Sequence, residues 1–104
     1  MTLGQQQELF SMLIAEHIIW LYSQNYQVRC GDFFAIPREP LEHKLNSQHY
    51  IKCAADLNLF QKGNFLTKTE DHKKSGEKWE SRHSMCRWGG RYNDGNHYEV
   101  IQWR

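Results

Sequence analysis

The chain has 104 residues, enough for one domain with a single modest core and too few for a second. Hydrophobic residues make up 39% and charged residues 24%, with a formal net charge of +1. This composition is ordinary for a globular protein and gives no electrostatic case for binding nucleic acid or an anionic membrane, so we expect one domain spanning residues 1–104.

The N-terminal region shows no pattern of a signal peptide or a membrane span. Its longest apolar stretch, residues 12–22, is interrupted by Glu16 and His17, and no basic start precedes an apolar run and a cleavage site. The three cysteines are too few and too unevenly spaced for a disulfide framework, so reduced thiols are expected. These features predict a protein made in the cytoplasm.

A helix is predicted first along the chain. Thr2 and Gln5 have the spacing of a capping box, and apolar residues follow at helical intervals. The residues on this face are Leu9, Phe10, Leu13, Ile14, His17, Ile18 and Leu21. We expect a helix over residues 4–24, ended by Asn25, which readily adopts the left-handed conformation. Residues 26–30 then alternate as a half-buried strand.

A loop and a hairpin are predicted in the middle of the chain. Residues 35–47 contain both prolines and no periodic pattern, which indicates a long loop. Residues 54–60 alternate as a strand with one apolar face. Lys62 and Gly63 predict a turn, after which Phe65 and Leu66 form a short return strand.

The last third of the chain predicts a surface helix and a final strand. Thr67 or Thr69 is expected to cap a helix that runs to about Arg82 and is anchored by Trp79 alone. Residues 88–97 predict glycine-rich turns, and residues 97–103 a strand. The expected fold is therefore α+β, with the N-terminal helix and the surface helix packed on an antiparallel sheet.

Asp56 is the unusual residue of the strand predicted over residues 54–60. Burying an unpaired carboxylate costs several kcal/mol, so we expect Asp56 to be paired, hydrogen-bonded or bound to a cation. Two histidines and a carboxylate form the ligand set of a zinc ion that keeps a fourth position for water. His49 and His97 could supply the other two ligands of such a Zn²⁺ site, which the sheet would then carry.

Asp94 precedes His97 by three residues in a glycine-rich turn, close enough to stand beside a metal without ligating it. A carboxylate in that position can take a proton from a zinc-activated water and pass it to a leaving amine. His83 and Cys86 make a second pair of possible ligands, but no third and fourth ligand accompany them, so no second site is expected.

These residues carry a resemblance to a known family. The stretches SQHYIKCAADLNLF and WGGRYNDGNHYE resemble the D-alanyl-D-alanine carboxypeptidase and L-alanyl-D-glutamate endopeptidase family, zinc peptidases of bacterial cell-wall peptides, and above all its single-domain phage and prophage members. The family pattern is Ser-x-His, six residues, Asp, and later Asp-x-x-His. The matching residues here are Ser47, His49, Asp56, Asp94 and His97. The resemblance covers roughly residues 8–99. It implies that the two histidines and Asp56 bind zinc, while Asp94 is the general base and then the general acid.

The chain departs from this family at one position. Relatives usually carry an arginine just after the first strand, in a segment such as GDxYR, where its charge is thought to stabilise the oxyanion of the reaction. Here Gly31-Asp-Phe-Phe34 is followed by Ala35. Removal of one such group from an active site costs about 10²–10³ in rate. Arg38, in the loop three residues further on, is our candidate for that catalytic role.

The resemblance implies a hydrolase, specifically a zinc metallopeptidase whose partner is the stem peptide of peptidoglycan. An endolysin of this kind is made in the host bacterial cytoplasm without its own signal peptide and degrades the cell wall from the periplasm. We expect no nucleic-acid partner, no membrane insertion and, by default, a monomer. Which peptide bond is cut, and whether the enzyme is an endopeptidase or a carboxypeptidase, stay open.

Two alternatives accompany this reading. Ala35 suggests a descendant of the family that retains zinc but hydrolyses weakly, and that binds a cell-wall fragment or a protein partner. A purely structural zinc domain is disfavoured because such sites usually close with four protein ligands and favour cysteine.

Overall fold

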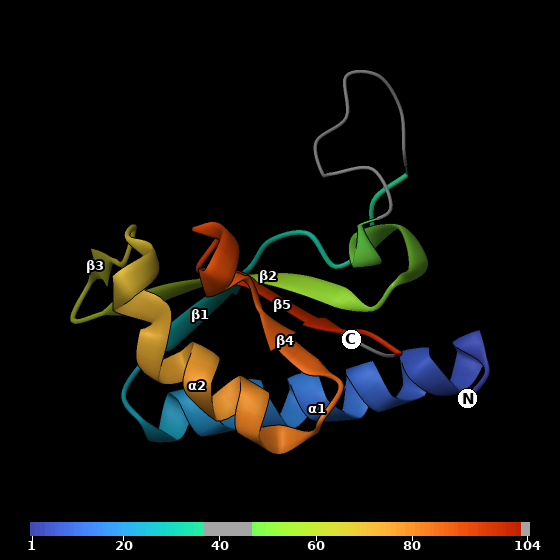
Figure 1. Cartoon of the computed structure of the whole chain (residues 1–104). Coiled ribbons are helices and arrows are strands. Elements are labelled where there is room, and N and C mark those ends of the chain that lie inside the picture. The colour runs from blue at the N-terminus through green and yellow to red at the C-terminus, as the bar shows by residue number, and fades with distance from the viewer. Residues whose placement is uncertain (37–46, 103–104) are drawn as a thin grey trace.

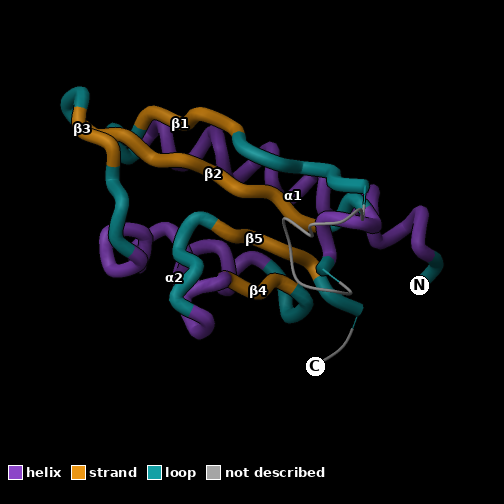
Figure 2. Tube along the Cα trace, turned by 90° about the horizontal axis from the view of Figure 1, so that it is seen from above, coloured by secondary structure: helices purple, strands orange, loops and turns teal. Residues whose placement is uncertain are grey.

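An antiparallel sheet carries both helices on one of its faces (Figure 1). The computed structural model describes residues 1–36 and 47–102. Its helices are α1 (Leu3–Ser23) and α2 (Lys73–Arg82), and its strands are β1 (Gln27–Cys30), β2 (Ala54–Gln61), β3 (Asn64–Phe65), β4 (Cys86–Trp88) and β5 (His97–Val100). The strand order is β1-β2-β5-β4, with β3 paired to β2 (Figure 2). The predicted α+β class is confirmed.

Helix α1 begins and ends where its sequence predicts, within one residue. The Thr2 hydroxyl accepts a hydrogen bond from the Gln5 amide, and the Gln5 side chain accepts one from the Thr2 amide, which completes the capping box. At the other end Asn25 has a φ of 67°, so the chain turns back into β1. No helix of the described residues is long and apolar enough to span a bilayer.

The alternation of β2 decides what each face of the sheet does. Ala55, Leu57 and Leu59 are fully buried and belong to the core under the two helices. Asp56 and Asn58 lie on the opposite face, which we call the open face because neither α-helix covers it (Figure 1). The strand predicted over residues 54–60 is therefore confirmed, and its polar residues point away from the core.

The core forms between the helices and the inner face of the sheet. Trp79 of α2 is fully buried and packs edge-on against Phe10 and Tyr98, at ring-centroid distances of 6.2 and 5.9 Å. Its indole N–H donates to the carbonyls of Arg87 and Glu99, at 3.2 and 3.1 Å. The single anchor predicted for α2 thus also ties the helix to the paired strands β4 and β5.

Three details of the last third differ from the prediction. The helical segment begins as a 3₁₀ turn over Thr69–His72 with Lys68 at its N-cap, and α2 follows. Neither threonine caps it, because the Thr69 hydroxyl instead accepts a hydrogen bond from the Gly95 amide. Strand β4 was missed, since three residues are too few to show a period. The final strand ends at Val100, and residue 103 lies outside the described residues.

His17 lies fully buried in a polar network beneath Trp79. Arg82 donates to its Nδ1 at 2.9 Å, so the ring hydrogen is on Nε2, which donates to the Ser75 hydroxyl at 2.9 Å. That hydroxyl in turn bonds the Tyr98 hydroxyl at 2.7 Å. Burial, reinforced by the Arg82 charge, lowers the pKa of His17 to about 3.

This network predicts a loss of stability in mild acid. His17 stays neutral in the folded protein down to about pH 3, whereas the unfolded chain protonates it near pH 6.5. Because the unfolded chain binds more protons between these values, the free energy of unfolding falls with falling pH, by up to about 1.4 kcal/mol per unit. Urea unfolding between pH 7 and 4.5 with chelator present measures this slope.

His17→Gln should flatten that slope. The pKa of His72 is also lowered by burial and contributes in the same direction, but it does so equally in parent and variant. The difference between the two slopes therefore isolates His17, and identical slopes would show that His17 does not titrate as described.

Candidate metal centre

His49 is held in place by a short 3₁₀ helix, Gln48–Ile51, which precedes β2 and lies on the side of the sheet away from the two α-helices (Figure 1). The Ser47 hydroxyl caps this helix by accepting a hydrogen bond from the His49 amide at 3.2 Å. Lys52 follows with a φ of 63°, which turns the chain sharply into β2. The Ser-x-His spacing thus has a local reason, because the serine orders the turn that directs the histidine, whose side chain is fully buried.

Strand pairing brings His97 to Asp56. The two residues are direct partners in the antiparallel ladder between β2 and β5, so their side chains leave the sheet on the same face. His97 is the first residue of β5, and Asp56 is the third of β2. Forty residues separate them in sequence, and the register of the two strands alone makes them neighbours.

The three predicted ligands form one cluster. Asp56 Oδ1 lies 3.1 Å from His49 Nε2 and 3.5 Å from His97 Nδ1. One ligand atom from each residue lies within 4.8 Å of the other two. Ligand atoms around a tetrahedral zinc ion are separated by about 3.3 Å, given bonds of about 2.0–2.1 Å. The three residues could therefore hold a metal ion, while the donor set does not fix which metal binds.

The charges of the cluster favour a cation. Burial by itself raises the pKa of Asp56, but hydrogen bonds and charge from His49 and His97 outweigh it and bring the pKa down to about 2. Burial lowers the pKa of His97, but Asp56 and Glu99 outweigh it and raise that pKa to about 9. At neutral pH the His97 ring thus carries a positive charge between two carboxylates unless a metal ion takes the place of the proton.

Glu99 is the residue of this site that the sequence prediction missed. It is a carboxylate only 5% exposed, and it contacts His97 on one side and Arg87 on the other. Burial raises the pKa of Glu99, but the charges and hydrogen bonds of His97 and Arg87 outweigh it and lower the pKa below its usual value. The sequence did contain a signal that Glu99 belongs to the site. Glu99 follows the predicted ligand His97 by two residues in a strand, and residues at that spacing share a face of the sheet.

Asp94 lies in a tight turn just before β5 and is exposed to solvent. Its amide donates to the Gly89 carbonyl at 3.0 Å, and its carbonyl accepts from the His97 amide at 3.1 Å. A side chain at Gly89 would meet the Asp94 carbonyl oxygen at 2.3 Å and His97 Cβ at 2.8 Å, so only glycine fits there. The glycine-rich segment therefore packs the Asp94 turn directly against the base of a candidate ligand.

A polar cavity of about 180 Å³ adjoins this turn. Asp94 and Asn96 line it from the turn, and Asn58 lines it from the open face of β2, two residues beyond Asp56. Thr67 and Thr69 contribute from the segment before α2. The cavity thus offers hydroxyl, amide and carboxylate groups next to the proposed proton acceptor.

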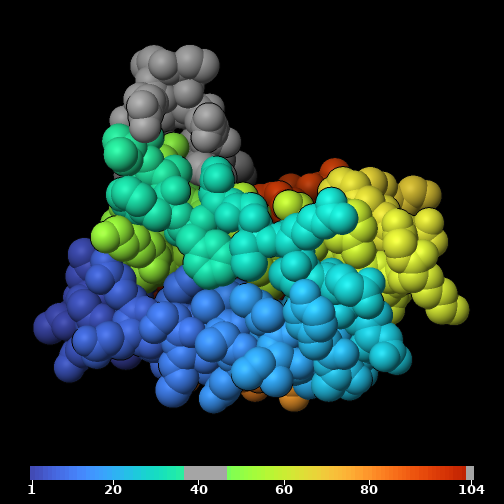
Figure 3. Space-filling model, turned by 180° about the vertical axis from the view of Figure 1, so that it is seen from behind, coloured from blue at the N-terminus to red at the C-terminus, as the bar shows by residue number. Residues whose placement is uncertain are grey.

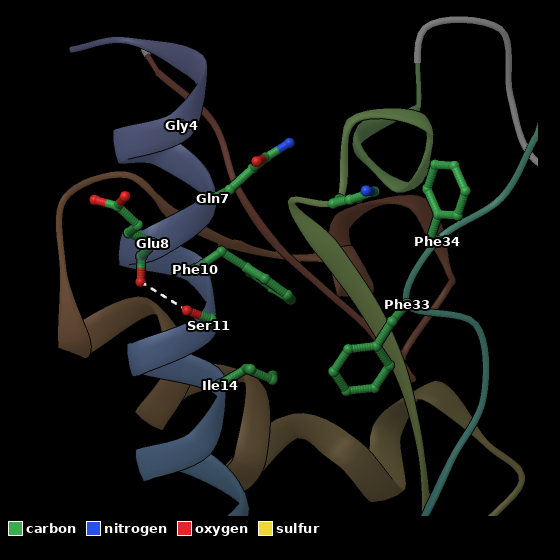
Figure 4. A pocket seen from close by; sticks show the side chains of 9 residues that line it. Gly4, Gln7, Glu8, Phe10, Ser11, Ile14, Phe33 and Phe34 are labelled. Carbon is green, nitrogen blue, oxygen red and sulfur yellow. Dashed lines mark hydrogen bonds between the residues drawn. The ribbon is translucent and has the colours of Figure 1, made fainter.

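A larger, apolar groove of about 480 Å³ lies elsewhere, between the N-terminal half of α1 and the segment after β1. The space-filling view shows this segment lying above the helix (Figure 3). Phe10 and Ile14 point from α1 toward Phe33 across the groove (Figure 4). Its lining includes none of the candidate ligands and not Asp94, so its chemistry is separate from theirs.

The remaining sequence predictions concern the position of Ala35, the role of Arg38 and a second pair of possible ligands. The Ala35 amide donates to the His49 carbonyl at 3.3 Å, so Ala35, where the resemblance leads us to expect an arginine, lies beside a candidate ligand. Arg38, predicted to replace that arginine, lies outside the described residues. His83 Nδ1 accepts a hydrogen bond from the Met85 amide, and among the described residues the cluster at Asp56 is the one group of three or more possible metal ligands.

Comparison of the chain with models of known protein families, with curated proteins and with solved structures finds no match. The resemblance to the cell-wall zinc peptidases therefore stays a prediction that rests on the residues themselves.

Proposed function

We propose that this chain is a zinc-dependent peptidase that hydrolyses peptide bonds in the stem peptide of peptidoglycan, as a phage or prophage lysis enzyme does. The observation that carries the proposal is the meeting of His49, Asp56 and His97 in one cluster, with Asp94 on the turn that leads into His97. A three-residue set with an open fourth position is typical of catalytic rather than structural zinc.

Each residue has a role in this proposal. His49, Asp56 and His97 would hold the ion, which supplies a Lewis acid and an activated water at neutral pH. Asp94 accepts the proton that the attacking water loses and donates it to the amine nitrogen of the leaving peptide. The exposure of Asp94 allows a substrate to reach it, and the polar cavity beside it suits the amide and hydroxyl groups of a peptide better than an apolar ligand.

Digestion of purified peptidoglycan tests the proposal. We expect fragments released in the presence of zinc and none with a chelator, and mass spectrometry of these fragments names the bond that is cut. Absence of cleavage by a folded, zinc-loaded protein would contradict the peptidase function.

A second function, binding without efficient hydrolysis, is favoured by Ala35. This residue adjoins His49 and brings no charge to a developing oxyanion. If this alternative holds, the parent cleaves negligibly, and Ala35→Arg raises the rate of cleavage in the same digestion. A parent that already cleaves briskly would count against it.

A further inference from the structure

Glu99 joins the candidate metal centre to a fixed positive charge on the neighbouring strand. Its Oε1 lies 2.6 Å from His97 Nε2, and its Oε2 lies 2.5 Å from both Nε and Nη2 of Arg87. His97 and Glu99 are two residues apart in β5, and Arg87 is the direct ladder partner of Glu99 in β4. All three side chains therefore lie on the open face of the sheet.

The contact with Glu99 determines which nitrogen of His97 is available to a metal ion. An ionised carboxylate only accepts hydrogen bonds, so the ring hydrogen facing Glu99 must be on Nε2. The other nitrogen, Nδ1, faces Asp56 at 3.5 Å, inside the cluster. A neutral ring held in this tautomer presents the lone pair of Nδ1 to the position that a metal would take.

Rigid elements support Glu99 in turn. The ladder between β4 and β5 sets the position of its backbone, and the Trp79 indole bonds the carbonyls of both Glu99 and Arg87. The Glu99 side chain is 7% exposed, which restricts competition from water. A side chain fixed by a strand pair and a buried tryptophan holds its partner more accurately than one on a loop.

We propose that Glu99 is a positioning residue of the metal centre. It orients the His97 ring, fixes its tautomer and strengthens Nδ1 as a ligand, while Arg87 holds the Glu99 carboxylate in the orientation that this requires. The inference rests on the metal site of the proposed function and does not require peptidase activity.

Zinc affinity, measured by competition with a chromophoric chelator, tests this role together with the visible absorption of the Co²⁺ form. Glu99→Gln should weaken zinc binding by about 10–100-fold and alter the cobalt spectrum, because the amide is a weaker acceptor and no longer pairs with Arg87. Glu99→Asp keeps the charge but withdraws the carboxylate by one methylene, so it should also weaken binding.

Glu80→Gln is the matched control, since Glu80 also pairs with an arginine, Arg91 at 3.2 Å, but on the surface and from α2, which lies on the other side of the sheet from the cluster (Figure 1). It should bind zinc as the parent does. Each protein is measured below its own unfolding temperature, so that a purely structural effect of Glu99 would lower stability without changing affinity.

The outcomes separate this inference from the proposed function. A parent that binds no zinc would overturn both. A parent that binds zinc, with Glu99→Gln binding within about twofold of it, would overturn the role of Glu99 and leave the metal site intact. If Glu99→Asp binds zinc with the affinity of the parent, the negative charge alone matters and the positioning role is wrong.

Discussion

Asp94→Asn is expected to lower the rate of peptide cleavage by about 10²–10⁴-fold while leaving the zinc content of the protein unchanged. The amide has nearly the shape of the carboxylate but cannot accept the proton of the attacking water. The turn that presents residue 94 is fixed by backbone hydrogen bonds to Gly89 and His97, which the substitution leaves in place. Initial rates on peptidoglycan fragments, with zinc determined on the same sample, measure both effects.

Asp71→Asn is a suitable control for this prediction. Asp71 is likewise an exposed aspartate in a short helical turn, where its carboxylate accepts from the Lys68 amide, a bond that asparagine can also accept. We expect it to cleave as the parent does. If Asp94→Asn cleaved within a few-fold of the parent, Asp94 would not be the proton acceptor; if it lost zinc as well, its role would be structural.

Helix α1 and strand β2 could be predicted because local sequence patterns determine them. The capping box at Thr2 and the apolar spacing after it predict α1 to within one residue at each end. The alternation around Asp56 predicts β2 and the side of the sheet that stays polar. Both signals depend on neighbours a few residues away, and the burial of one face reinforces them.

The pairing of the strands could not be predicted from local sequence patterns. Strand β4 has three residues and no period, and its existence depends on the partner β5 and on the Trp79 indole that bonds both. The Thr69 hydroxyl illustrates the same limit, because it bonds the Gly95 amide twenty-six residues away instead of capping the helix beside it. The hydrogen-bond partner of such a polar side chain can lie far away in sequence, and only folding brings the two residues close.

The candidate site likewise contains residues that the sequence predicted and one that it did not. Its three candidate ligands were predictable because residue type and spacing point to them, although their convergence depends on the β2–β5 register. Glu99 was missed: its spacing from His97 indicated a shared face of the sheet, but its pairing with Arg87 depends on a strand that the sequence did not reveal. The residues that support a ligand are thus harder to recognise than the ligand itself.

Zinc is expected to stabilise the folded protein strongly, and this stabilisation should require Asp56. An ion that binds the folded chain alone adds about 4 kcal/mol to the free energy of unfolding when its concentration is about 1,000 times its Kd. For a domain of about 100 residues, each kcal/mol raises Tm by about 4 °C or more, so the parent should gain more than about 10 °C. Thermal unfolding with zinc and with chelator measures the gain.

Asp56→Asn should lose most of this gain. Asparagine keeps the size of the side chain but removes the negative charge that lies between the two histidines, 3.1 and 3.5 Å from their nitrogens. A pair of imidazoles without the carboxylate binds zinc more weakly, because only two ligands and no balancing charge remain. Asp94→Asn should retain the full gain, since Asp94 is not among the three residues proposed to hold the ion. Equal stabilisation of Asp56→Asn and the parent would show that zinc binds somewhere other than this cluster, whereas loss in Asp56→Asn alone would separate the residue that holds the metal from the residue that moves the proton.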